Sequence, residues 1–168
     1  MKKILSTLIA LTLIVGASFA QGLKLGHINS NQLLSVMPET KAADSVLQKF
    51  GTSLQNQLQT MNSEYESKVG EYKKNEASML DAVKEMKVKE ITDLEDRIRE
   101  FQQSAQENIS KKKEEIYAPI LKKAEEAIKG IAKEKGYTYI FDAGGGVLLY
   151  SQDSDDILPL VKAKLGLK

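Results

Sequence analysis

Few residues in this sequence could do chemistry. His27 is the only histidine, and the chain has no cysteine. A metal site needs several ligands that converge on one point, and a hydroxyl nucleophile needs a base beside it. His27 stands in a short apolar segment, where a packed or edge-exposed strand residue is the expected role. We therefore predict no enzymatic activity, no metal site and no cofactor.

The glycine-rich segment Asp142–Gly146 is the one stretch that could suggest a phosphate-binding loop. Such a loop needs the N-terminus of a helix directly after it. Here the next residues, Val147–Tyr150, are apolar and β-prone, so a turn between two strands is the better interpretation. Adjacent carboxylates such as Glu114 and Glu115 point apart on a helix and do not converge on a substrate.

The first twenty residues have the pattern of an export signal. Lys2 and Lys3 precede a mostly apolar run, 4–15, and small residues follow at Ser18 and Ala20. This order predicts a signal peptide, 1–20, that is cleaved after Ala20 to leave the chain in the periplasm. An uncleaved membrane anchor is the alternative, but the run is short for a membrane span.

The remaining chain has the composition of long solvated helices. Of the 168 residues 28% are charged and 6% are aromatic, and tryptophan is absent. Without the first twenty residues the chain has 22 basic and 23 acidic side chains, so a nucleic-acid partner is not expected. No later segment has eighteen consecutive apolar residues, which predicts no transmembrane segment in the mature chain.

The middle of the chain, 39–135, has a regular helical stripe of apolar residues. They recur at offsets of three, four and four, which makes eleven residues per three turns. Such a narrow stripe packs against one neighbouring helix and leaves the other faces in water. The three rows are Leu47, Leu58, Val69 and Leu80; Phe50, Met61, Tyr72 and Val83; and Leu54 and Tyr65. The same frame continues to Ile120 and is interrupted by Lys87, Gln102 and Lys113.

The stripe alone does not decide between one helix and two. No glycine or proline lies between Gly70 and Pro119, which favours a single helix of 97 residues, roughly 145 Å long. The flanking segments argue the other way, because short strands before and after the helix must meet to be stable. That requires a turn near 80–90 and arms of roughly 65–70 Å.

Short strands and helices are expected at the two ends of the long helical region. The first are a strand at 23–29 and a helix at 30–36 that Ser30 could cap, followed by Pro38 in the first turn of the next helix. Gly136 is expected to end the helical region. A strand at 137–142, a returning strand at 147–150 and a final helix then complete the chain.

The residues at both ends of the chain resemble a known family. These residues are His27-Ile28-Asn29 before Leu33-Leu34, then 135–143, 147–151 and 155–157. They resemble the Skp/OmpH family of periplasmic chaperones. The resemblance implies an α+β fold that is mostly α, a long antiparallel helical hairpin inserted into a small β body. The arm is expected at 39–135, and the body at 21–38 and 136–168. Three such bodies would share a β-barrel, with core residues Leu25, Ile28, Tyr139, Phe141, Val147 and Leu149.

The resemblance also implies a function. The family holds unfolded outer-membrane proteins after export and prevents their aggregation without ATP. Client contacts are expected to be diffuse and to include the adaptable side chains of Met61, Met79 and Met86 on the arm interior. A structural coiled-coil spacer or scaffold without clients is the alternative, and association with the outer membrane is a weaker one.

One property of the family does not match this chain. The family's namesake is strongly basic, which is linked to binding of lipopolysaccharide and anionic membranes. Residues 68–99 have eight basic and eight acidic side chains, and Lys111–Lys113 is the only basic run. We therefore do not expect a lipopolysaccharide site.

Overall fold

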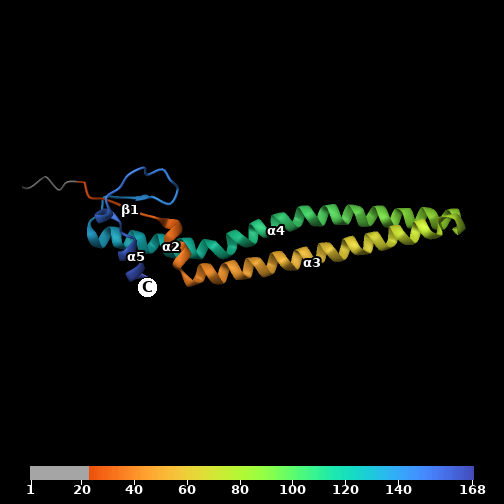
Figure 1. Ribbon diagram of the computed structural model, residues 1–168, viewed down its shortest axis with the longest axis horizontal. Helices are drawn as coiled ribbons and strands as arrows, with labels where there is room; N and C mark the ends of the chain where they lie inside the picture. Colours follow the sequence, from red (N-terminus) through yellow and green to blue (C-terminus); the bar gives the residue numbers. More distant parts are fainter. Residues whose placement is uncertain (1–22) are drawn as a thin grey trace, which may run out of the picture. The chain divides into compact units, whose positions relative to one another are not determined.

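The computed structural model describes residues 23–168 and shows a mostly helical chain with a small sheet (Figure 1). The expected signal peptide lies outside the described residues. Contacts divide the chain into two compact units: one contains the residues up to Val36 together with Lys123–Lys168, and the other is Met37–Lys122. In order, the elements are β1 (Leu25–Ile28), α2 (Ser30–Val36), α3 (Pro38–Asn75), η1 (Glu76–Ser78), α4 (Asp81–Lys135), β2 (Tyr139–Asp142), η2 (Asp153–Asp155) and α5 (Leu158–Lys164).

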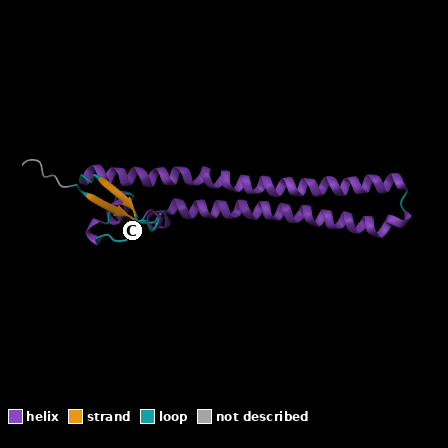
Figure 2. Ribbon diagram, turned by 90° about the horizontal axis from the view of Figure 1, so that it is seen from above, coloured by secondary structure: helices purple, strands orange, loops and turns teal. Residues whose placement is uncertain are grey.

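The sheet of the first unit has two parallel strands, β1 and β2 (Figure 2). Leu25 pairs with Tyr139, and Ile28 pairs with Asp142. More than a hundred residues separate the two strands, as a parallel pair requires a crossover connection. The expected returning strand at 147–150 is wrong, because this segment forms no strand in the single chain.

The core of the first unit comes from several short elements. Leu33, Ile157 and Val161 are fully buried, and the backbone N–H of Ile157 donates to the carbonyl of His27 at 2.9 Å. The last turns of α4 also contribute Ala124, Ala127 and Ile131, each at most 6% exposed. The first compact unit therefore includes 123–135, a part of the range predicted for the arm.

The end of α4 follows the expected glycine signal. Gly136 has φ +71°, a left-handed conformation that glycine adopts without a steric penalty. Its N–H donates to the carbonyl of Lys133 at 3.4 Å, and the N–H of Tyr137 donates to that of Ala132 at 2.9 Å. These two bonds form a Schellman motif, which satisfies carbonyls that the helix end leaves open.

In the second unit, α3 and α4 lie side by side and antiparallel in both views (Figures 1 and 2). The chain reverses at η1 and the next two residues, Met79 and Leu80. This reversal rules out the single 97-residue helix. It also comes earlier than the expected 80–90, since Asp81 already begins α4.

The reversal needs neither glycine nor proline. The Ser78 hydroxyl donates to the carbonyl of Asn75 at 2.9 Å, and the N–H of Met79 donates to that of Glu76 at 3.3 Å. Met79 is extended, with φ −80° and ψ 145°. No described residue other than glycine has a positive φ. Ordinary residues can therefore form this turn, which explains why the sequence contains no turn signal there.

The stripe of α3 forms the seam between the two helices. Its members, at the offsets of three, four and four, are half-buried while the residues between them are mostly exposed; they are Leu47, Phe50, Leu54, Leu58, Met61, Tyr65, Val69 and Tyr72. Leu80, the next predicted member, is 77% exposed because it lies in the turn. The turn therefore interrupts the stripe, and Val83, the next predicted member, is half-buried in α4.

In α4 the frame extrapolated from α3 continues, and its apolar members are all half-buried or buried: Ile91, Leu94, Ile98, Ala105, Ile109, Ile116 and Ile120. The frame shifts by one residue at two of its predicted interruptions, where Phe101 and Lys112 are half-buried and the neighbouring Gln102 and Lys113 are exposed. Leu94 is 2% exposed and is the best buried residue of this face. Apart from these two positions, the stripe predicted for α4 is confirmed.

Gly51 offers a test of the helix itself. A Cβ at this position would meet nothing within 4 Å, so packing does not require glycine there. We expect Gly51→Ala to raise the midpoint of thermal unfolding, since alanine is favoured over glycine in a helix interior by up to about 1 kcal/mol. Gly136→Ala is the matched control and should lower the midpoint because of its positive φ. A lower midpoint for Gly51→Ala would contradict this description of α3.

Candidate functional site

The outward face of the two-stranded sheet is apolar and exposed. Side chains alternate along a strand, so Leu25 and His27 share one face with their register partners Tyr139 and Phe141. Leu25, Tyr139 and Phe141 are 43%, 55% and 47% exposed. The Tyr139 and Phe141 rings stack, with centroids 6.4 Å apart. Three large apolar side chains in one patch mark a surface suited to association.

The segment after β2 extends this apolar surface. Val147, Leu149 and Tyr150 are 86%, 96% and 80% exposed. A short strand needs a neighbour to satisfy its backbone, and within the described chain 147–150 pairs with none. Of the six residues expected in a trimer core, only Ile28 is buried within one chain, at 2% exposure. The assignment of the other five to a shared core stays a prediction.

His27 does not form a catalytic group with its surroundings. Its Nδ1 atom is buried without a hydrogen-bond partner. The small cavity beside it is lined mainly by apolar side chains and by Ser151 and Asp155. Among residues 23–168 no cluster of three or more His, Cys, Asp or Glu could hold a metal ion. His27 is therefore a half-buried strand residue on the apolar face.

The glycine-rich segment binds a carboxylate of its own chain. Asp142 Oδ1 accepts hydrogen bonds from the backbone N–H of Gly144 at 2.8 Å and of Ser30 at 3.1 Å. Its Oδ2 accepts from the Ser30 hydroxyl at 2.6 Å. This hydroxyl is the main reason that the pKa of Asp142 is lowered. We call this arrangement the Asp142 clasp, and it joins the end of β2 to the start of α2.

The clasp also corrects the expected cap of α2. The side chain of Asn29, not that of Ser30, caps the helix, because Asn29 Oδ1 accepts from the N–H of Gln32 at 2.9 Å. Ser30 is the first helical residue and instead donates to Asp142. The Asn31 amide donates to the carbonyl of Gly144 at 3.0 Å, which holds the other side of the loop.

The Asp142 clasp gives a pH prediction. Because the pKa of Asp142 is lowered in the folded chain, its stabilising effect is present at neutral pH and is lost as the pH falls below about 4. Asp142→Asn should cost about 1 kcal/mol at pH 7, since the group is largely exposed. Urea unfolding at pH 7 and pH 3 measures the difference.

Asp153→Asn is the matched control for this measurement, at an exposed position. The control should unfold like the parent protein at both pH values. The Asp142→Asn difference should be large at pH 7 and small at pH 3. An equal difference at both values would show that the charge of Asp142 has no role in the clasp.

Ion pairs join the two helices of the hairpin near its turn. Lys68 bonds to Glu90, and Lys87 bonds to Glu71 at 3.3 Å. The two pairs are symmetric about position 79, so they fix the antiparallel register. The hydrogen bond between Lys68 and Glu90 raises the pKa of the lysine and lowers that of the glutamate. Lys87, which interrupts the apolar stripe, was the sequence signal for this network.

A further bond joins the hairpin at its other end. The Tyr117 hydroxyl donates to the carboxylate of Asp44. This hydrogen bond, together with partial burial, raises the pKa of Tyr117. The hairpin is therefore held by polar bonds at both ends and by the apolar seam between them.

The three methionines expected to contact clients do not form one site. Met61 is half-buried in the seam, Met79 is half-buried in the turn, and Met86 is 60% exposed on α4. Sequence reasoning missed that Leu80 and Val88 are also exposed, at 77% and 47%. The role of Met61, Met79 and Met86 as client contacts stays a prediction.

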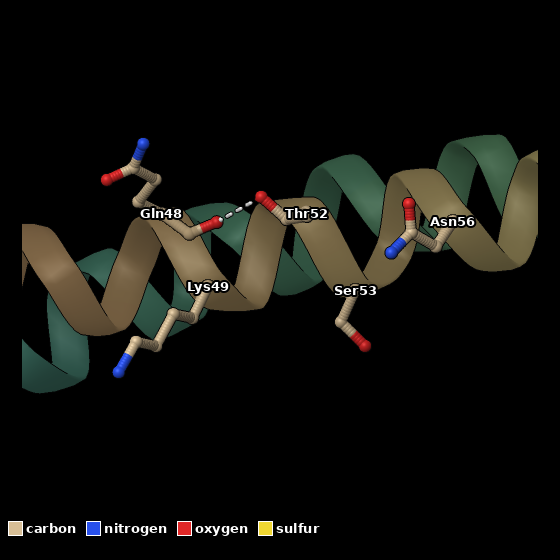
Figure 3. Close-up of a pocket in the computed structure, with 5 residues that line it drawn as sticks. All are labelled: Gln48, Lys49, Thr52, Ser53 and Asn56. Atoms are coloured by element: carbon tan, nitrogen blue, oxygen red, sulfur yellow. Dashed lines mark hydrogen bonds between the residues drawn. The ribbon is translucent and has the colours of Figure 1, made fainter.

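A shallow groove lies on the exposed side of α3 (Figure 3). It is lined by Gln48, Lys49, Thr52, Ser53 and Asn56, and the Thr52 hydroxyl donates to the carbonyl of Gln48 at 3.0 Å. It contains no acid–base pair and no metal ligand set.

Across the described residues, no helix combines the length and apolar character that a membrane crossing requires.

Comparison with known proteins now identifies the family. The model of a family described as outer membrane protein (OmpH-like) matches residues 24–165, which is most of the chain. The chain belongs to the OmpH-like family. Membership assigns a chaperone-type role at the level of the family, without enzymatic chemistry, and implies a location in the cell envelope.

A solved structure supports the fold of this OmpH-like chain. It is similar to a crystal structure from Caulobacter crescentus CB15, described as an outer membrane chaperone (OmpH-like), with a TM-score of 0.75. The match covers 84% of this chain and 82% of the other, at 11% sequence identity. At this identity the likeness shows the fold alone. No curated protein matches the chain.

Proposed function

We propose that this OmpH-like chain is a periplasmic holdase that binds unfolded outer-membrane proteins after export and prevents their aggregation without ATP. The observation that carries the proposal is the reversal of the chain at Glu76–Leu80 in a member of this family. The reversal produces a helical hairpin with a narrow apolar seam and solvent-exposed outer faces. Weak, distributed contacts along such a surface can hold a client without imposing a conformation on it.

Self-association is part of the proposal. The exposed apolar patch of Leu25, Tyr139 and Phe141, with Val147 and Leu149 after it, leaves a single chain with open sheet edges. Closure of short strands from several copies would bury these side chains and remove the edges. We propose three copies, as the family resemblance implies. The body would associate and the hairpins would contact clients.

The reversal also weighs against the alternative of a structural spacer. A spacer in the form of a rod of roughly 145 Å requires one continuous helix from 39 to 135. Instead α3 ends at Asn75 and α4 begins at Asp81. The export signal expected at 1–20 supports the periplasm as the place of action.

The direct test is suppression of aggregation. A urea-unfolded outer-membrane barrel protein is diluted into buffer with and without the purified chain, and light scattering is followed. We expect near-stoichiometric trimer to abolish most of the scattering without ATP, and serum albumin at the same mass to have little effect. Unchanged scattering with the trimer would refute the holdase function.

A further inference from the structure

We propose that an uncharged band halfway along the hairpin binds the main chain of an extended polypeptide through side-chain amides. The band consists of residues 50–63 of α3 and 101–106 of α4. The inference rests on the proposed holdase function and deepens it, because it names the part of the client that is recognised.

The band differs from the rest of the hairpin in charge. Neither of its two segments contains a charged residue, whereas residues 64–100 have 19 charged side chains. The polar residues of the band are instead Gln, Asn, Ser and Thr, and each of them is exposed. A long surface helix usually carries charge throughout, so this gap is a feature of the hairpin that stability alone does not require.

The two segments lie at the same height along the hairpin. Lys68 bonds to Glu90 on one side of the band, and Tyr117 bonds to Asp44 on the other. In this antiparallel register, 101–106 lies opposite the middle of 50–63. The uncharged residues of both helices therefore form one continuous band around the hairpin.

The amides of the band are free to bind. The hydroxyls of Thr52, Thr60 and Ser104 donate to backbone carbonyls of their own helices, at 3.0 Å each. By contrast, the side-chain amides of Gln55, Gln59 and the other Gln and Asn residues of the band make no hydrogen bond within the described chain. The groove between Gln48 and Asn56 runs into the band (Figure 3).

Amide side chains match the peptide group. Each Gln or Asn offers both a donor and an acceptor, as a peptide bond does. An unfolded chain presents peptide groups at every residue, whatever its sequence. A surface that bears amides and no charge can therefore bind polypeptides of either net charge without desolvating an ion. A chaperone with many different clients needs this kind of contact.

The test uses two synthetic probes. One is a capped 30-residue peptide of uncharged residues that alternate apolar and polar, and the other is the same peptide with every second backbone nitrogen methylated. Methylation removes peptide donors and leaves the side chains unchanged. We expect the full-length assembly to bind the unmethylated peptide about tenfold more tightly, as the net effect of a few hydrogen bonds.

Variants of opposite charge test the band itself. Gln55, Gln59 and Gln103 are replaced together by Glu in one protein and by Lys in another. We expect both variants to bind the unmethylated peptide about tenfold more weakly. The control adds the same three charges outside the band, by Ser67→Glu, Ala77→Glu and Ala82→Glu at exposed positions, and should bind as the parent does. Circular dichroism checks that each protein keeps its helices.

Several results would overturn the inference. They are equal binding of the two probes, no binding of either, parent-like binding by both band variants, and weakening by only one sign of charge. A lower assembly mass of both band variants in sedimentation, with the control unchanged, would show that the band joins copies of this chain. If the parent still suppresses aggregation of the barrel protein in any of these cases, the holdase function stands and only the band is refuted.

Discussion

Phe141→Asp should convert the assembled protein into single chains. The side chain is 47% exposed within one chain, so the substitution does not disturb the core of that chain. In the proposed trimer it would place an unpaired carboxylate in a buried apolar contact, which costs several kcal/mol. Sedimentation velocity should show the mass fall from three copies to one. Suppression of aggregation should fall with it.

Val88→Asp is the matched control for this prediction. Val88 is also apolar and 47% exposed, but it lies on α4 near the turn of the hairpin. This variant should keep the mass of three copies. If Phe141→Asp and Leu149→Asp both stayed trimeric, the sheet face and the segment after it would not be the association surface.

Leu33→Ala should strongly destabilise the body. Leu33 is fully buried in α2, and its truncation removes apolar contacts and leaves a cavity. Such substitutions cost about 2–5 kcal/mol, and we expect about 3 kcal/mol here. Urea unfolding at fixed protein concentration should show a clearly lower midpoint. Because the body would carry the association surface, a loss of trimer should accompany it.

Leu23→Ala separates burial from the simple loss of a leucine. Leu23 is 66% exposed in the same unit, so its truncation should change the midpoint little. Equal effects of the two substitutions would contradict the assignment of the core to α2, α5 and the end of α4.

The long elements could be predicted from the sequence because their signals are local and repeated. The eleven-residue rows through Leu47, Phe50 and Leu54 mark the seam of α3 correctly. Pro38 begins α3 and Gly136 follows the end of α4, as their backbone preferences require. The long helices and their ends could therefore be predicted from the sequence alone.

The turn and the small sheet were less accessible, because they depend on contacts between distant residues. The turn at Glu76–Leu80 uses ordinary backbone conformations, so no residue type marks it. The pairing of β1 with β2 joins residues more than a hundred positions apart, and a strand pattern at 147–150 cannot show which partner, if any, it finds. The Asp142 clasp is likewise a contact between α2 and β2 that local patterns do not reveal.

The candidate site was predictable only in part. The apolar residues of the expected trimer core were named from the family resemblance, but their exposure in one chain became visible only in the structure. The uncharged band can be recognised in the sequence, because its two segments contain no charged residue. That its two halves lie opposite each other depends on the position of the turn.

Native mass spectrometry of the complex tests the central claim most directly. The purified chain is mixed with a urea-unfolded outer-membrane barrel protein, diluted, and measured intact. Our account predicts a species with the mass of three chains plus one barrel protein. Our account would be contradicted if the spectra showed only single chains without a bound barrel protein at every concentration tested.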